Sequence, residues 1–280
     1  MPPNSPAPQP PASLVVPAET VRYGREREAQ HPVEVAVEAP VNIVYGNMPY
    51  AVMMATPTDL EDFVTGFSLT EGIVRGVDEI RGIAVEAKPE GILVTVDLAP
   101  GRFREHLARR RNLSGRTACG LCGVETIEEI PQAEAGTRGT RAIPASAIEA
   151  ALTALDRHQP LNHLTRAVHA AAWCTPDGAI LAAREDVGRH NALDKLIGAR
   201  LRAGGDPAEG FVLVTSRASF EMVEKTAIFG AGTLVAISAP TSLAIERATH
   251  LGLTLAAIAR GDGCVVFTGA LAAELETQAG

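Results

Sequence analysis

FVLVTSRASFEMVEKTAIFGAGTLVAISAPTSLAIERATHLGLTLAAIA, residues 211–259, decides the fold of this chain. Short apolar runs that are typical of buried strands alternate here with longer segments that are typical of helices. Strands that alternate with helices predict a layered α/β domain with a mostly parallel central sheet. The predicted strands are 211–215, 233–238 and 253–259, and the predicted helices between them are 219–229 and 241–251.

The same pattern continues on both sides of this stretch, so residues 142–280 are assigned to one main α/β domain. Two strands on the N-terminal side form a predicted hairpin, because Thr175-Pro176-Asp177-Gly178 between them has the composition of a tight turn. The predicted elements here are helices at 145–158 and 189–203, the hairpin strands 167–174 and 179–183, and a last strand at 264–268.

Residues 19–131 have a different pattern and are assigned to a smaller N-terminal α+β domain. Its first three strands are expected to lie in one antiparallel sheet. They precede a helix that Thr58 can cap and that carries Glu61 three residues later. The arginine-rich stretch near 103–112 is predicted to be helical. The predicted strands are 33–39, 41–45, 50–55, 80–86 and 92–98.

Two further segments lack a regular apolar pattern. Residues 1–18 are rich in proline and have neither the basic start nor the long apolar run of a secretory signal, so we expect a disordered tail. Small and polar residues predict a linker over 132–141.

The composition narrows the class of protein. With 280 residues, of which 46% are hydrophobic and 21% charged, the chain has the composition of a soluble globular protein. Its formal net charge of −8 argues against general nucleic-acid binding, and no apolar run reaches the ~18 residues that span a membrane. Four cysteines are too few for a disulfide scaffold, so we expect a reducing, cytoplasmic setting.

Two of the cysteines lie in GRTACGLCG, residues 115–123, which we call the cysteine segment. Its glycines predict a mobile loop, and such loops more often carry chemistry than packing. A zinc site is disfavoured because structural zinc needs four ligands, and Cys174 and Cys264 stand alone in predicted strands. A thioredoxin-like pair is disfavoured because it belongs between a strand and a helix. The third interpretation is a nucleophilic or sulfur-carrying thiolate.

Such a thiolate needs a low pKa. An unperturbed thiol has a pKa of about 8.5, and lowering it by about two units takes roughly 2.7 kcal/mol. One solvent-screened arginine at about 4 Å supplies only ~1 kcal/mol. From Arg102 to Arg116 there are six arginines against one acidic residue, Glu105, and together they could supply the difference. The alternative is a solvated basic helix face beside a flexible loop.

Two polar clusters occur where a predicted strand leads into a helix. Residues 184–196, REDVGRHNALDKL, occupy the place where open α/β sheets bind ligands, and a helix start offers free amides for an anion. Residues 215–222, TSRASFEM, have the same design: Ser216 and Ser219 can cap the helix, and Arg217 can hold a phosphate. Ordinary helix capping with exposed charges is the alternative for both.

Other signatures are absent or weak. The chain has no Gly-x-x-x-x-Gly-Lys-Ser/Thr phosphate loop, and Gly230-Ala231-Gly232 lacks the third glycine of a dinucleotide fingerprint. No histidine is followed two residues later by glutamate, so the zinc deaminase pattern is missing. His169, in an apolar predicted strand, is by itself more typical of a core histidine than of a catalytic one.

Taken together, these segments resemble the FdhD family of formate dehydrogenase accessory sulfurtransferases, from about Val21 to Phe267. Four motifs in family order are more specific than any one of them. They are GRTACGLCGVE (115–125), HAAAW (169–173), REDVGRHNALDKLIG (184–198) and TSRASFEMVEKTAIFGAGTLVAISAPTSLAIE (215–246).

The resemblance implies a homodimer whose main domain is similar in fold to cytidine deaminases but lacks their zinc. It also implies that a cysteine desulfurase loads sulfane sulfur as a persulfide on Cys119, with Cys122 as helper. The sulfur then passes to the bis-molybdopterin guanine dinucleotide cofactor before its insertion into formate dehydrogenase, and a guanine nucleotide can occupy the cofactor's place. The cofactor-binding stretch that the family implies is Ile258-Ala259-Arg260-Gly261-Asp262-Gly263.

Further residues are candidates for binding the same cofactor. The arginines of 102–116, together with Arg189 and Arg217, are expected to hold the pyrophosphates and the anionic sulfur. His169 and His190 are expected to handle protons or to contact guanine. Two alternatives remain: a chaperone that only binds the molybdenum cofactor and has structural or redox thiols, and a zinc-dependent hydrolase.

The chain departs from the family at two places. Thr165-Arg166 stands where the family usually has Thr-Gly, which leaves the local backbone conformation open. The last loop has one basic residue, Arg260, together with Asp262, so its interaction with a phosphate is expected to differ.

Overall fold

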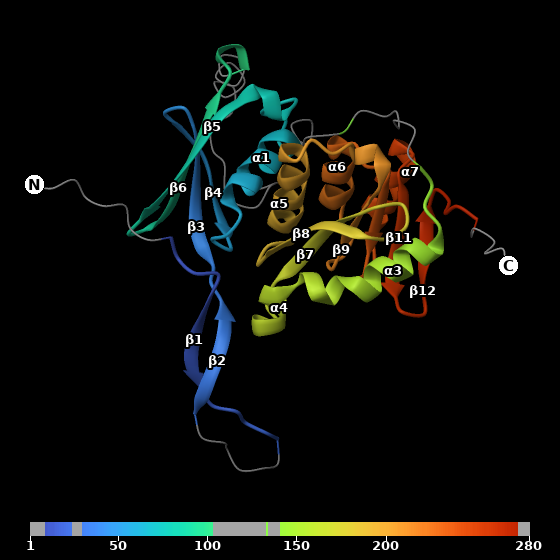
Figure 1. The fold of residues 1–280 in the computed structure, drawn as a ribbon, viewed down its shortest axis with the longest axis horizontal. Coiled ribbons are helices and arrows are strands. Elements are labelled where there is room, and N and C mark those ends of the chain that lie inside the picture. The colour runs from blue at the N-terminus through green and yellow to red at the C-terminus, as the bar shows by residue number, and fades with distance from the viewer. Residues whose placement is uncertain (1–8, 24–29, 103–132, 134–140, 274–280) are drawn as a thin grey trace, which may run out of the picture.

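The computed structural model describes residues 9–23, 30–102, 133 and 141–273. Within these residues the chain forms a two-stranded ribbon, a four-stranded sheet and a six-stranded sheet (Figure 1). The strands are β1 (Ser13–Ala18), β2 (His31–Ala36), β3 (Ala39–Tyr45), β4 (Met48–Ala55), β5 (Ile80–Lys88), β6 (Gly91–Leu98), β7 (His169–Cys174), β8 (Ile180–Asp186), β9 (Phe211–Val214), β10 (Thr233–Ala236), β11 (Thr254–Arg260) and β12 (Gly263–Thr268). The helices are α1 (Leu60–Thr70), α3 (Ala145–Leu155), α4 (Pro160–Thr165), α5 (Arg189–Arg202), α6 (Phe220–Phe229) and α7 (Ser242–Leu251), with single turns η1 (Val77–Glu79), η3 (Asp156–His158) and η4 (Pro207–Glu209).

The six-stranded sheet has the order β12-β11-β10-β9-β7-β8. Every strand and helix predicted between 211 and 268 is confirmed within a few residues. The prediction of a mostly parallel sheet is wrong, because only β9, β10 and β11 run parallel to one another. On one side of this parallel centre, β12 pairs antiparallel with β11, its partner in a hairpin. On the other side, β7 pairs antiparallel with β9, and β8 pairs antiparallel with β7. The helix α4 was not predicted.

The alternation of side chains along β9 shows why this sheet is covered on both faces. Val212 and Val214 belong to the core on the side of α5, α6 and α7, whereas Phe211 and Leu213 belong to a second core that includes Ile148 of α3. All four strand residues are buried. The layered α/β fold is therefore confirmed (Figure 1), and its likeness to cytidine deaminases stays a prediction.

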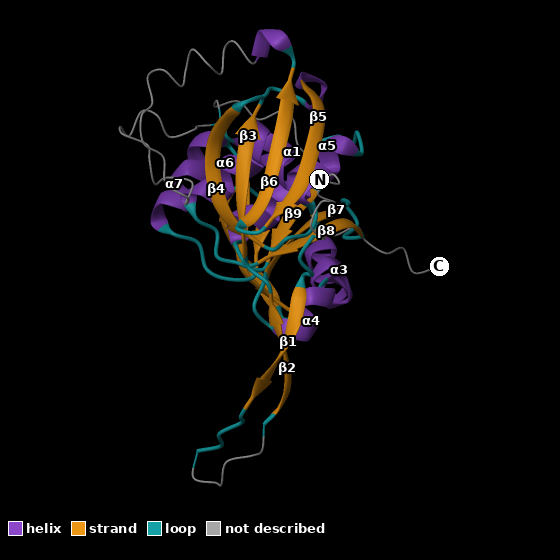
Figure 2. Cartoon of the chain, turned by 90° about the vertical axis from the view of Figure 1, so that its left-hand side faces the viewer, coloured by secondary structure: helices purple, strands orange, loops and turns teal. Residues whose placement is uncertain are grey.

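The four-stranded sheet has the order β4-β3-β6-β5. Its β3 and β6 are parallel, with Val41 paired to Ile92, while the other neighbours are antiparallel. The antiparallel pairing predicted for the strands at 41–45 and 50–55 is confirmed, because β3 and β4 are antiparallel neighbours. The β5–β6 hairpin returns beside β3 after the chain has crossed over through α1. Figure 2 shows this sheet in front of α1.

The first two strands form a separate ribbon that projects from the rest of the chain (Figures 1 and 2). They pair antiparallel from Ser13 opposite Ala36 to Ala18 opposite His31. The prediction of a disordered tail up to residue 18 is therefore wrong for Ser13–Ala18, because proline is tolerated in such a narrow ribbon. The strand predicted at 33–39 lies mostly in this ribbon rather than in the sheet.

Helix α1 joins the two sheets, since one buried apolar cluster includes residues of both. It begins at Leu60 after Asp59, which has a left-handed backbone with φ 52° and makes no side-chain cap. The predicted cap at Thr58 is therefore wrong. Glu61 lies 2.5 Å from Arg202 of α5 instead of closing a capping box. The division of the chain into domains at 131 and 141 stays a prediction, since residues 103–132 and 134–140 lie outside the described ones.

Helices α1 and α5 cross at two glycines. A Cβ placed on Gly66 would lie 1.9 Å from the carbonyl oxygen of Asp194, and one placed on Gly198 would lie 1.9 Å from that of Asp62. Both obstacles are backbone atoms, which cannot rotate away. Only glycine therefore allows the two helices to approach this closely.

We expect Gly66→Ala to lower the free energy of unfolding by about 3 kcal/mol, because the helices must separate to admit the methyl group. The better helix propensity of alanine returns only about 1 kcal/mol. Gly82→Ala is the matched control, since no atom lies within 4 Å of its added Cβ. Urea unfolding of the two variants measures the difference, and equal stability would contradict the close crossing.

Arg166 stands where the family usually has glycine, and its backbone keeps a conformation that glycine adopts freely. Arg166 follows α4 with φ 53°, in the left-handed region, and its N–H donates to the carbonyl of Asn162 at 2.8 Å. The helix end is thus kept although a side chain stands where the family usually has glycine.

Candidate functional site

The candidate site lies at one edge of the six-stranded sheet, which we call the polar edge. The carboxyl ends of β9, β10 and β11 meet there because these strands are parallel. His169 lies at the same edge, because β7 is antiparallel to β9 and Thr215 N–H donates to Ala170 O at 3.0 Å. Asp186, at the end of β8, is paired with His169. Helices α5, α6 and α7 follow β8, β9 and β10, so all three present their N-termini to this edge (Figure 1).

Three of the predicted residues gather around the N-termini of α5 and α6. Burial, followed by the charges of Arg189 and His190, holds the pKa of His169 below its ordinary value. His190 Nε2 lies 2.6 Å from Glu221 Oε2 in the first turn of α6. Burial alone raises the pKa of Glu221, but the contact with His190 and the nearby charges of Lys225 and Arg189 lower it overall. His169 is therefore a neutral imidazole at neutral pH, beside the contact between His190 and Glu221.

Apart from His190 Nε2, which lies beside Glu221, two buried donors at this edge have no hydrogen-bond partner among the described residues. They are Arg189 Nε and the hydroxyl of Ser219. Ser219 is at the N-cap of α6 and does not cap it, and the Ser216 hydroxyl donates to Arg217 O at 3.1 Å. Both predicted serine caps are therefore wrong. The Arg217 side chain is exposed, and the structure gives its guanidinium no ion pair with a described residue.

The stretch that the resemblance implies for cofactor binding begins at the same edge. Ile258 N–H donates to Ser238 O at 3.2 Å, which places Ile258 beside the end of β10. Its φ of 53° is rare for a β-branched residue, and such strain is found mainly at functional sites. The side chain of Ala259 is buried, whereas Arg260, Gly261, Asp262 and Gly263 are exposed around the β11–β12 turn.

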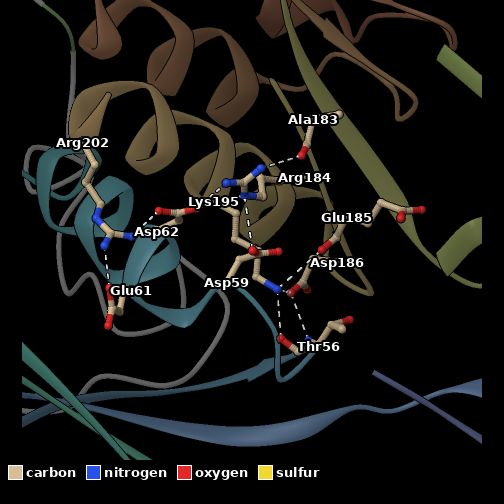
Figure 3. A network of polar contacts seen from close by, with 10 residues as sticks. All are labelled: Thr56, Asp59, Glu61, Asp62, Ala183, Arg184, Glu185, Asp186, Lys195 and Arg202. Carbon is tan, nitrogen blue, oxygen red and sulfur yellow. Dashed lines mark hydrogen bonds and ion pairs between the residues drawn. The ribbon is translucent and has the colours of Figure 1, made fainter. Parts of the chain in front are cut away.

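Most of the cluster at 184–196 is structural (Figure 3). The Asp186 carboxylate accepts hydrogen bonds from the Thr56 and Gly188 amides and from the Asn191 side chain, at 3.0, 2.8 and 3.0 Å. It also pairs at 2.7 Å with the fully buried Lys195, which donates to Thr56 O. These residues hold the start of α5 against the end of β4. Of this cluster, only Arg189 and His190 remain candidates for the ligand.

Figure 3 also shows how α1 is held to its neighbours. Asp62 accepts from Arg184 of β8 at 2.7 Å and from Arg202 of α5 at 2.6 Å, and Arg202 also reaches Glu61. Arg184 therefore holds β8 to α1 and is not a candidate for binding the ligand.

A second buried network was not predicted. Lys225 of α6 lies 2.9 Å from an oxygen of Asp194 on α5, donates to Thr70 at 2.8 Å and approaches Glu71 at 3.7 Å. Burial alone lowers the pKa of Lys225, but Asp194 and Glu71 raise it overall, whereas burial raises the pKa of Glu71. The network lies one helical turn below Glu221 and fixes α1, α5 and α6 together. Polar residues within otherwise buried helix faces are its only signal in the sequence.

The predicted thiols lie outside the described residues: Cys119 and Cys122 fall within 103–132. The same holds for five of the six arginines and for the helix predicted near 103–112. The sixth, Arg102, is buried and donates to Ile73 O at 2.6 Å and Gly72 O at 2.8 Å. The prediction that Arg102 holds a pyrophosphate is therefore wrong, because its guanidinium is engaged with the backbone after α1.

The other two cysteines lie in strands, as predicted. Cys174 is buried in β7, and burial raises its pKa; burial also raises the pKa of Cys264 in β12. Neither is a thiolate at neutral pH. The described residues contain no group of three or more His, Cys, Asp and Glu side chains that could hold a metal ion. None of the described helices is long and apolar enough to cross a membrane.

Comparison with known proteins defines the class of this chain. The model of the FdhD/NarQ family matches residues 36–273, and the chain belongs to that family. A protein of Variovorax paradoxus is 48% identical over 234 residues, covering 84% of each chain, and one of Xanthomonas euvesicatoria pv. vesicatoria is 48% identical over 258 residues, covering 92% of this chain and 91% of the relative. Both relatives are named sulfur carrier protein FdhD.

A solved structure is also similar. It is that of a Desulfotalea psychrophila protein proposed to be a formate dehydrogenase accessory protein. It superposes with a TM-score of 0.73 at 26% identity, covering 92% of this chain and 98% of the other.

Proposed function

We propose that this protein is a sulfur carrier in the maturation of formate dehydrogenase. The observation that carries the proposal is the cysteine segment within the matched family region, since the relatives described above are named sulfur carrier protein FdhD. The polar edge supports it, because three helix N-termini and unpartnered buried donors suit an anionic substrate. We place the protein in the cytoplasm as a homodimer.

The proposed chemistry has two steps. The Cys119 thiolate attacks the terminal sulfur of the persulfide on a cysteine desulfurase. The new S–S bond forms as the old one breaks, which leaves a Cys119 persulfide and a desulfurase thiolate. In the second step the Cys122 thiolate attacks the Cys119 sulfur, forms a disulfide and releases hydrosulfide to the acceptor. A cellular dithiol then reduces the disulfide for the next cycle.

The proposed acceptor is the bis-molybdopterin guanine dinucleotide, which is the substrate that receives the sulfur. Arg189 and Arg217 would hold its phosphates, with the Ser219 hydroxyl donating a further hydrogen bond. The backbone of 258–263 would line the neighbouring part of the site, and the neutral His169 can accept a proton or contact guanine. Zinc has no role in this scheme.

GDP should bind at the polar edge in place of the cofactor, and Arg217→Met should weaken it at least about tenfold, because a charge-assisted hydrogen bond contributes about 1.5–3 kcal/mol. Arg81→Met is the control, since Arg81 is exposed on β5 in the other sheet. Titration calorimetry measures both affinities. Equal affinity in all three proteins would contradict a phosphate contact by Arg217.

A chaperone that only binds the cofactor would share the polar edge but would not need a persulfide. Loss of function on replacing Cys119, argued in the Discussion, separates the two.

A further inference from the structure

Ala133 is held by two side chains of the main sheet's helices. Its N–H donates to Glu224 Oε2 at 2.6 Å, and its carbonyl accepts from Arg247 Nη2 at 2.7 Å. Glu224 and Arg247 also form an ion pair with each other, and their side chains are 4% and 12% exposed. We call these two side chains the clamp. Both polar groups of one backbone residue are thus satisfied by a buried pair of charges.

The clamp lies close to the polar edge. Glu224 is four residues into α6 from Phe220, and Arg247 is five residues into α7 from Ser242. At a rise of about 1.5 Å per residue, these positions are roughly 6 and 8 Å along their helices from the ends that face the edge. Ala133 itself packs against the apolar cluster shared by the two sheets.

Ala133, which the clamp holds, follows the cysteine segment closely in the sequence. Cys122 precedes Ala133 by 11 residues, and an extended chain of that length reaches at most about 40 Å. On the other side of the cysteine segment, Arg102 is buried and bonded to the backbone at Gly72 and Ile73. The chain is therefore fixed to the folded body before and after the thiols.

A buried ion pair is a poor way to gain stability, because its desolvation penalty offsets much of the attraction. An apolar pair would cover Ala133 as well, but it could not hold both its N–H and its carbonyl. The clamp instead specifies one position and direction of the chain at this residue.

We propose that Glu224 and Arg247 are positioning residues for sulfur transfer, which hold the chain after the cysteine segment so that the loaded thiol stays within reach of the polar edge. The inference rests on the proposed function. It assigns no contact between these two residues and the substrate.

The test uses the full chain with the double change Glu224→Gln and Arg247→Met, which removes both charges and leaves no buried charge unpaired. Three properties are measured: sulfur loading of Cys119 by a cysteine desulfurase and cysteine, hydrogen exchange at the Ala133 amide, and formate dehydrogenase activity in cells that lack their own copy. Arg202→Met is the matched control, because it removes a paired arginine from α5 without touching the clamp.

The double variant should load sulfur as the wild type does, should exchange the Ala133 amide faster and should activate the dehydrogenase about ten- to a hundredfold less, since small misplacements have effects of this size. Arg247→Lys should restore stability through its charge but not activation, because lysine lacks the second arm that reaches Ala133. Unchanged activation in the double variant, an equal loss in Arg202→Met, or full activation by Arg247→Lys would each overturn the positioning role. Absence of loading in the wild type would instead contradict the proposed function, and the inference would fall with it.

Discussion

Cells whose only copy of this protein carries Cys119→Ala should make formate dehydrogenase with at least about a hundredfold less activity, because the nucleophile that accepts the sulfur is gone. The rest of the site remains, so the variant should still bind GDP as the wild type does. Formate oxidation in cell extracts, with the dehydrogenase quantified by immunoblot, measures the effect.

Cys264→Ala is the matched control for this change. Cys264 lies in β12, and burial raises its pKa, so it is protonated at neutral pH. We expect its replacement to leave the activity unchanged. Cys122→Ala should still load sulfur on Cys119, because loading needs only the first thiol, but it should also lose activity, because the Cys122 thiolate releases that sulfur in the second step. Full activity in the Cys119→Ala variant would favour the chaperone that only binds the cofactor.

Lys225→Met should lower the free energy of unfolding by about 3–5 kcal/mol, because it leaves the buried Asp194 carboxylate without its cation. Lys88→Met is the control: Lys88 pairs with Glu86 at the surface, and such pairs contribute at most about 1 kcal/mol. Denaturant unfolding at pH 7 compares the two. A loss no larger than that of Lys88→Met would contradict the role assigned to the network.

The same network has a defined pH dependence. The pKa of Lys225 is raised in the folded state, so its contribution to stability is fully present below the ordinary lysine pKa. It is lost only as the pH rises through the higher folded value.

A double variant, Asp194→Leu with Lys225→Met, removes both charges and should recover much of the stability that Lys225→Met alone loses.

Local patterns predicted most of the elements. The strands and helices of 211–268 follow from apolar runs separated by turn residues, because each β9 side chain, such as Val212 or Leu213, is buried on one of two covered faces. The pairing of strands does not follow from such patterns. The parallel contact between Val41 and Ile92 requires a crossover through α1, which no local signal specifies.

The candidate site was predicted in part. His169, Arg189, His190 and Arg217 all lie at one edge of the sheet, because strand ends that lead into helices lie side by side in this fold. The roles of the residues within the motif could not be predicted, since one partner of Asp186 is Thr56, which lies 130 residues earlier in the sequence. Glu221 was missed although it stands in a quoted motif, because its significance depends on contact with His190.

The most direct test of the sulfur-carrier account is mass spectrometry of the purified protein after incubation with a cysteine desulfurase and cysteine. The account predicts that the peptide containing the cysteine segment gains the mass of one sulfur atom, located on Cys119, and that a reducing thiol removes it. A protein that gains no sulfur, or gains it on Cys264 instead, would contradict the account.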